Sequence, residues 1–321
     1  MRFLALSFLA LAVCASALTA ADTSAAGKKI LYVNAYHEGY AWSDGVTKGL
    51  KSVLTPSGAE LKIFLMDTKN NPAKEFAPQK GVEAKALIET WKPDVVVVSD
   101  DNPCKWLIQP FYKDATLPFV FCGVNWNGEV YGFPYANTCG MYEIALVNEC
   151  VVQLQKFTKG KRITFLTADV ETSQKDAIWL KKILAEKGYT LESRFASDFA
   201  GWKAAYQELQ AGTDMLILDQ AGIKDWNKEQ AIAFIEAHTK IPSGCVIEYM
   251  PPYSLLGYTK ISEEQGEWAA GAALQILAGK KPSEIGETQN KKAKTFFNPK
   301  LAKKLGVTPD LSFIKQAEIV K

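Results

Sequence analysis

The chain has 321 residues, of which 48% are hydrophobic and 22% charged, so it has enough apolar side chains to fold and is long enough for two domains. Its 37 Lys and Arg residues nearly balance 35 Asp and Glu residues. This balance argues against a nucleic-acid partner, because binding to phosphates requires a basic surface.

The N-terminus has the pattern of a secretory signal peptide. Arg2 gives it a positive start, residues 3–18 are apolar, and two small-residue cleavage sites end near residues 17 and 21. We therefore expect residues 1–21 to be removed and the mature protein to lie in the periplasm. A lipoprotein anchored at Cys14 is the less favoured alternative, because Val13 is larger than the residue such sites prefer.

Five cysteines remain after this leader, and an odd number leaves at least one thiol unpaired within the chain. Export permits disulfides. Cys104 and Cys139 both lie near predicted strand ends and are candidates for a disulfide. The alternative is that both are small buried residues with free thiols.

Short apolar runs alternate with helical patterns through the first half of the chain. The apolar runs predict strands at 30–33, 61–65, 95–98 and 119–121. Apolar spacing predicts a helix that begins at Ser43, with Ser43 as its N-cap, and a second helix over 75–91. The run of four valines at 95–98 is apolar on both faces, as strands of buried parallel sheets are.

The same alternation restarts after Asn137. We predict strands at 163–166, 191–195, 215–218 and 245–247, and helices at 143–157, 173–187, 202–210, 229–238 and 263–277. Two successive βα arrays predict an α/β fold of two doubly wound parallel-sheet lobes joined by a hinge.

Polar and aromatic residues follow these strands. In open parallel sheets ligands bind at the carboxyl ends of the strands, so these residues should meet at one cleft. Aromatic walls with a few polar groups are typical of a pocket for a small organic ligand, here of aromatic or amino-acid-like character. The expected ligand-binding residues are Tyr36, His37, Tyr40, Trp42, Asp100, Asp101, Asn125, Trp126, Asp169, Ser173, Asp219 and Glu248.

Catalysis and metal binding have little support. The chain has only two histidines, His37 and His238, and it lacks nucleophile-elbow, zinc-protease, P-loop and dinucleotide-binding motifs. A transition-metal importer would offer several imidazoles to one ion. We expect no catalytic residue, no cofactor and no metal.

The segment from Leu256 to Ile285 resembles the closing helix of a known family. The residues that match the family's pattern include Gly271, Ala278-Gly279 and Pro282-Ser283-Glu284-Ile285. That family is the type I periplasmic solute-binding proteins of ABC importers, specifically the branch whose characterised members take up aromatic amino acids. Residues 137–140 resemble its crossing between lobes, and 298–307 resemble its C-terminal helix.

The resemblance implies an N-terminal lobe of 28–138 plus 259–281 and a C-terminal lobe of 139–258 plus 282–321. It also implies a membrane permease as partner, and we expect a monomer. Asp100 and Asp101 stand where small hydroxyl residues would receive a carboxylate, so the ligand should differ from that of the characterised members. The alternatives are a ligand-sensing module for a separate receptor or kinase and, less favoured, an enzyme on the same scaffold.

Overall fold

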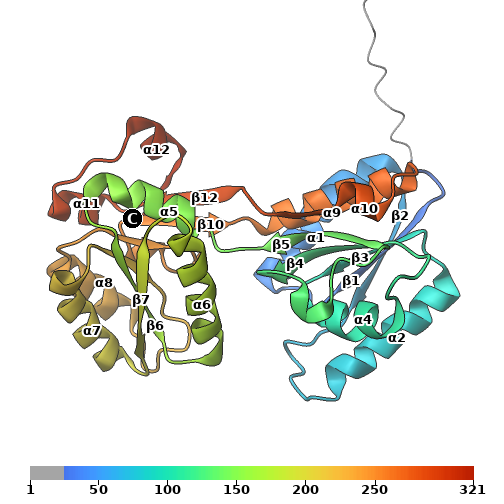
Figure 1. The fold of residues 1–321 in the computed structure, drawn as a ribbon, viewed down its shortest axis with the longest axis horizontal. Coiled ribbons are helices and arrows are strands. Elements are labelled where there is room, and N and C mark those ends of the chain that lie inside the picture. The colour runs from blue at the N-terminus through green and yellow to red at the C-terminus, as the bar shows by residue number, and fades with distance from the viewer. Residues whose placement is uncertain (1–24) are drawn as a thin grey trace, which may run out of the picture.

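The computed structural model describes residues 25–321, which form two α/β lobes side by side (Figure 1). The predicted signal peptide and the alternative lipid anchor at Cys14 lie outside the described residues. None of the helices in the described part of the chain combines the length and apolar character that crossing a bilayer requires.

The first lobe is built on a six-stranded sheet in the order β11-β5-β4-β3-β1-β2, and each pair of neighbours is parallel. Its strands are β1 (Lys29–Asn34), β2 (Glu60–Leu65), β3 (Val95–Ser99), β4 (Phe119–Asn125), β5 (Thr138–Glu143) and β11 (Glu287–Gln289). The four strands predicted in this region are all present.

The second lobe is built on a seven-stranded sheet in the order β13-β12-β10-β9-β8-β6-β7. Only the β10–β12 pair is antiparallel. Its strands are β6 (Arg162–Ala168), β7 (Thr190–Ala196), β8 (Met215–Leu218), β9 (Ser243–Cys245), β10 (Leu256–Lys260), β12 (Ala293–Phe297) and β13 (Glu318–Ile319).

Helices cover both faces of each sheet (Figure 1). Those of the first lobe are α1 (Ala41–Ser57), α2 (Phe76–Trp91), α3 (Asp101–Pro103), α4 (Gln109–Phe111), α9 (Ser262–Leu277) and α10 (Pro282–Ile285), with a π-helical stretch, η1, at Cys104–Ile108. Those of the second lobe are α5 (Val147–Leu154), α6 (Glu171–Ala185), α7 (Phe199–Gly212), α8 (Lys228–His238), α11 (Pro299–Leu305) and α12 (Leu311–Gln316).

Three details of the predicted elements were wrong. The strand expected at 245–247 lies two residues earlier, as β9 at Ser243–Cys245. The helix expected over 143–157 begins only at Val147, because β5 occupies Thr138–Glu143. Ser43 is not an N-cap: α1 begins at Ala41, and the Ser43 hydroxyl donates to Asn34 Oδ1 at 2.9 Å. Ser43 therefore ties α1 to the end of β1 instead of ending the helix.

Close contact between α1 and α9 depends on glycine. A Cβ at Gly266 would lie 2.0 Å from the carbonyl oxygen of Val46, and one at Gly49 would lie 2.1 Å from that of Glu263. Both glycines therefore let the two helix backbones approach more closely than any side chain would permit.

The candidate disulfide between Cys104 and Cys139 does not form, and both residues are buried free thiols. The reason is their placement on opposite faces of the first sheet. Cys104 packs with Leu31 and Val33, whereas Cys139 packs with the residues of β1 that face the other way, including Tyr32. Burial raises the pKa of the Cys139 thiol to about 12.

The predicted residue ranges of the two lobes stay a prediction. Because β5 and β11 pair with each other in the first sheet, and β10 and β12 pair in the second, we propose that the chain crosses between lobes near residues 144, 261 and 291. The backbone N–H of Ile144 donates to Asn290 Oδ1, and that of Lys291 donates to the carboxylate of Glu264. The three proposed crossings are therefore neighbours.

Candidate functional site

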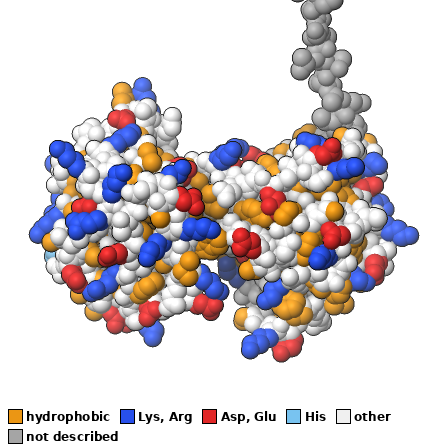
Figure 2. Space-filling model, viewed as in Figure 1, with side chains coloured by type: hydrophobic (Ala, Val, Ile, Leu, Met, Phe, Trp, Pro, Cys, Tyr) orange, Lys and Arg blue, Asp and Glu red, His pale blue; other side chains and the backbone are white. Residues whose placement is uncertain are grey.

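A cleft lies between the two lobes, at the carboxyl ends of strands from both sheets, and Figure 2 shows the surface hollowed there. It consists of two adjoining cavities of about 310 and 100 Å³. Both cavities share a set of lining residues, namely Asn125, Glu143, Val246, Ile247 and Lys260.

Most of the predicted ligand-binding residues line this cleft. The larger cavity is lined by Tyr36, Tyr40, Trp42, Asp100, Asn125 and Glu248, and the smaller one by Asn125, Trp126 and Asp219. The first lobe thus supplies most of the aromatic wall, and the loops after β8 and β9 supply carboxylates from the second lobe.

Four predicted residues do not line either cavity. Asp101 lies behind the wall, where its carboxylate accepts from Asn125 Nδ2 and from the Tyr131 hydroxyl, both at 2.7 Å. Asp101 therefore holds Asn125 in place rather than facing the cleft.

The other three also have partners elsewhere. His37 Nδ1 lies 3.4 Å from an oxygen of Asp67. The Ser173 hydroxyl accepts from Thr167 Oγ1 at 3.0 Å. Asp169 accepts from Gln174 Nε2 at 2.9 Å.

Sequence reasoning missed several residues of the wall. Among those with ionisable side chains, Glu143 ends β5 and Lys260 ends β10, and Lys69, Asp176 and Tyr249 were missed as well. Both strand-end residues would have followed from the rule that ligands meet strand ends, had β5 and β10 been predicted as strands.

Asp100 has an unusual environment. It follows β3 with a φ of 68°, is 2% exposed, and accepts from Trp42 Nε1 at 3.0 Å through Oδ1. Its other oxygen, Oδ2, is buried and has no hydrogen-bond partner among the described residues. Burial, with the charges of Glu143 and Asp101, raises the pKa of this carboxyl well above its usual range.

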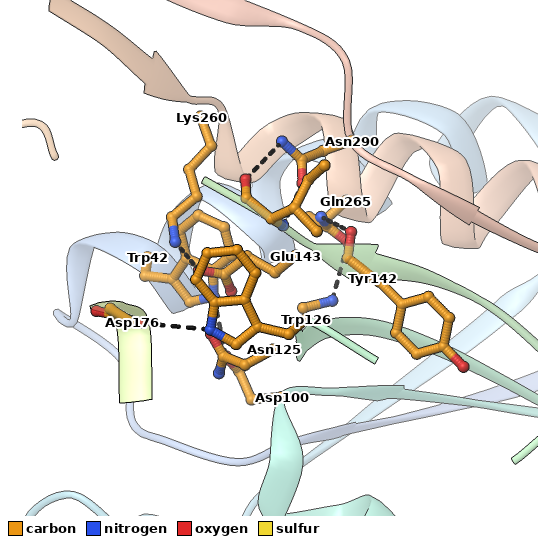
Figure 3. Close-up of polar contacts among 12 residues, drawn as sticks. Trp42, Asp100, Asn125, Trp126, Tyr142, Glu143, Asp176, Lys260, Gln265 and Asn290 are labelled. Atoms are coloured by element: carbon orange, nitrogen blue, oxygen red, sulfur yellow. Dashed lines mark hydrogen bonds and ion pairs between the residues drawn. The ribbon is translucent and has the colours of Figure 1, made fainter. Parts of the chain in front are cut away.

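Lys260 and Glu143 form an ion pair beside Asp100 (Figure 3). Burial raises the pKa of Glu143 although Lys260 opposes the shift. Burial lowers the pKa of Lys260, but the ion pair with Glu143 outweighs it and leaves that pKa raised. The Lys260 ammonium also lies 5.4 Å from the ring centroid of Trp42.

Trp126 joins the two lobes across the cleft. Its indole N–H donates to Asp176 Oδ1 at 3.3 Å, and its ring stacks on Trp179 with centroids 5.8 Å apart. Both partners belong to α6 of the second lobe, whereas Trp126 follows β4 of the first. Figure 3 shows the contact between Trp126 and Asp176.

Asp219 is held in the second lobe by several donors. Its Oδ1 accepts from the backbone N–H groups of Gln220 and Ala221, at 2.7 and 3.1 Å, and from the Tyr249 hydroxyl at 3.1 Å. Tyr249 extends toward the cleft from the loop after β9.

Lys69 lies over the aromatic wall of the first lobe. Its ammonium is 3.8 Å from the ring centroid of Tyr40 and 4.6 Å from that of Tyr36. It also donates to the Tyr40 hydroxyl at 2.5 Å. Within residues 25–321, no group of three or more His, Cys, Asp or Glu side chains has the geometry to hold a metal ion.

Comparison with solved structures places the architecture among two-lobed binding proteins. The chain is similar to a substrate binding protein with adhesive properties from Clostridium difficile, in its ligand-free open structure (15% identity, 92% of this chain and 99% of that one, TM-score 0.70). It is also similar to an ABC domain from Streptococcus pneumonia in complex with L-Trp (16% identity, 91% of this chain and 100% of that one, TM-score 0.56). A periplasmic ribose ABC transporter protein from Conexibacter woesei matches at 14% identity over 92% of this chain and 99% of that one, with a TM-score of 0.55.

These likenesses confirm the predicted fold, that of type I periplasmic binding proteins. No curated protein matches the chain. The family model described as ABC transporter substrate binding protein matches residues 36–321. The chain therefore belongs to the ABC transporter substrate binding protein family.

Proposed function

We propose that this chain is an extracytoplasmic solute-binding protein that captures a small organic ligand between its lobes and delivers it to an ABC importer. The observation that carries the proposal is the cleft itself: the first lobe contributes Trp42 and Asp100, and the second contributes Glu248. A ligand that contacts both lobes stabilises the closed arrangement, because only contacts made better in that state can shift the equilibrium.

The aromatic wall favours a ligand with a ring or another flat apolar part. Tyr36 and Tyr40 pack edge to face with centroids 5.2 Å apart, and Trp42 is fixed by its hydrogen bond to Asp100. Such rings offer a large contact area at little cost in side-chain entropy. Catalysis forms no part of the proposal, since the family and the fold are those of substrate-binding proteins.

A thermal-shift screen of the mature chain tests the proposal. The compounds should include amino acids, aromatic acids, organic amines, nucleobases and sugars. A ligand at 100 times its dissociation constant should add about 2.7 kcal/mol to the free energy of unfolding. For a chain of this size that corresponds to a rise in Tm of roughly 5–10 °C.

The Tyr40→Ala variant should lose most of this shift. Tyr189→Ala is the matched control, since Tyr189 is another half-buried tyrosine beneath a lysine, with the Lys161 ammonium 5.6 Å from its ring, and it lies outside the cleft. A screen in which no compound raises Tm, or a shift that survives Tyr40→Ala, would contradict the proposal.

A further inference from the structure

The charges around the cleft are unbalanced. Its two cavities are lined by five acidic side chains and two lysines, namely Asp100, Glu143, Asp176, Asp219 and Glu248 against Lys69 and Lys260. When all are ionised, five carboxylates against two ammonium groups leave a net charge of −3. With Asp100 protonated, as its raised pKa favours, the net charge is −2 and has the same sign. A cleft of this sign attracts cations and repels anions.

One of these carboxylates lacks a donor. Asp100 is 2% exposed and lines the larger cavity, yet its Oδ2 has no hydrogen-bond partner among the described residues. A buried polar atom without a partner is costly, and a native structure that keeps one there requires an explanation. The positive φ of Asp100, rare for a residue other than glycine, is a second sign of a functional position.

The aromatic walls already hold ammonium groups. Lys69 lies over the rings of Tyr36 and Tyr40, and Lys260 lies 5.4 Å from the ring centroid of Trp42. Aromatic faces attract cations through their ring quadrupoles. The rings nearest Asp100 therefore favour positive charge as well as apolar contact.

Donors that could hold a carboxylate of a ligand already have an acceptor each, and two of these acceptors are carboxylates. Lys260 is paired with Glu143, Asn125 Nδ2 donates to Asp101, and Lys69 donates to the Tyr40 hydroxyl. Lys260 and Asn125 keep further N–H groups, but a carboxylate bound there would lie close to the carboxylates of Glu143 and Asp101. A cationic group would instead supply the donor that Asp100 Oδ2 lacks.

We infer that the ligand is a small organic cation, whose ammonium or guanidinium group donates to Asp100 Oδ2 while its apolar part packs against Trp42 and Tyr36. The inference rests on the proposed function, because it specifies the ligand of the same cleft. It separates an amine without a carboxylate from the zwitterionic amino acid of the same skeleton.

Titration calorimetry with matched compounds tests the inference on the wild-type chain. Three sets hold the skeleton nearly constant and change only the charge: tyramine, tyrosine and 3-(4-hydroxyphenyl)propionate; histamine, histidine and imidazolepropionate; tryptamine, tryptophan and indole-3-propionate. In at least one set the cation should bind at least tenfold more tightly than the zwitterion, and the acid should bind weakest.

The Asp100→Asn variant keeps the acceptor for Trp42 but removes the charge, so it should weaken binding of the cation by at least tenfold. Asp94→Asn is the matched control, because Asp94 lies at the opposite end of β3 and contacts Lys28 and the backbone of Lys29. It should bind the cation as the wild type does.

Three results would overturn the inference: a zwitterion or acid as the tightest binder in every set that binds, an Asp100→Asn variant with unchanged affinity for the cation, or no binding by any of the three cations. In each case the broader thermal-shift screen still decides the proposed function on its own, since a sugar, nucleobase or acid that binds in the cleft would leave solute binding intact.

Discussion

The ammonium of Lys260 and the carboxylate of Glu143 form an ion pair that joins the carboxyl end of β10 to that of β5. These two strands belong to different sheets, and the chain crosses between lobes just after each of them. The pair therefore lies where the hinge and the ligand cleft meet, so its charge balance bears on both stability and closure.

Removal of Lys260 should destabilise the protein. In Lys260→Met the buried carboxylate of Glu143, only 8% exposed, loses its partner, and breaking such a pair is far more costly than replacing both partners. Because the Lys260 side chain is 30% exposed, we expect a loss of about 1–3 kcal/mol in the free energy of unfolding, measured by urea denaturation.

The double variant Glu143→Gln, Lys260→Met should recover part of that loss. Lys294→Met is the control, because Lys294 pairs with Glu318 on the exposed surface of the same lobe and should cost less than about 1 kcal/mol. Equal losses in the two single lysine variants would show that the buried pair has no special role.

Asp100 should make stability depend on pH. Its pKa is raised in the folded state, so the folded protein binds a proton more tightly than the unfolded chain does at this site. The contribution of Asp100 to the free energy of unfolding is therefore greatest below its ordinary pKa of 3.8. It decreases as the pH rises from 3.8 toward the pKa of Asp100 in the folded protein. The titratable groups around it are Tyr32, Tyr36, Asp101, Cys104, Cys122, Glu143 and Lys260.

Asp100→Asn removes this titration. In the absence of ligand, its Tm should exceed that of the wild type at pH 7 by a few degrees. A change of about 1 kcal/mol in the free energy of unfolding corresponds to a change of about 2–4 °C in Tm. The difference should shrink as pH falls toward 4, which Tm measurements from pH 4 to 8 would follow. A difference that stays constant over that range would mean that Asp100 does not titrate as proposed.

Sequence patterns located the parts of the cleft that follow strongly apolar strands. Four consecutive valines identify β3, so Asp100 at its end could be placed by the strand-end rule. Trp42 could be placed in the same way, because it follows the apolar strand β1. Local sequence is sufficient where a strand is buried on both faces and rich in β-branched residues.

Glu143 and Lys260 could not be found in this way. Strand β5 has the sequence TCGMYE and β10 has LGYTK, which lack an apolar run and contain glycine. Their strand conformation comes from pairing with neighbours far away in sequence, as between β5 and β11. That pairing is a tertiary effect, which a local pattern cannot reveal.

Two glycines of α9 should respond to alanine with opposite signs. A Cβ at Gly266 meets the backbone of α1, and overpacking of this kind costs about 1–3 kcal/mol. A Cβ at Gly271 meets nothing within 4 Å, so alanine there should stabilise the helix by about 0.5–1 kcal/mol. Urea denaturation of Gly266→Ala and Gly271→Ala measures both, and the same sign for the two would contradict the packing of α9 on α1.

The cysteines of residues 25–321 should be inert in the folded protein. All five are buried and free, and burial raises the pKa of Cys245, like that of Cys139, to about 12. Reaction with a disulfide reagent requires an accessible thiolate. A native sample should therefore release almost no thionitrobenzoate from such a reagent, and a denatured one should release five equivalents. Three equivalents after denaturation without reductant would instead indicate a disulfide.

The bridge that Trp126 forms to α6 should favour the arrangement in which the lobes are close. Trp126→Phe removes the hydrogen bond to Asp176 and part of the stacking on Trp179. These contacts are worth roughly 1–2 kcal/mol together, so ligand affinity should fall by about tenfold, and solution scattering should show a larger radius of gyration. Trp106→Phe is the control, since Trp106 lies in the first lobe beside α2, outside the cleft, and should change neither quantity. If Trp126→Phe binds ligand as tightly as the wild type, the contact between the lobes does not contribute to capture.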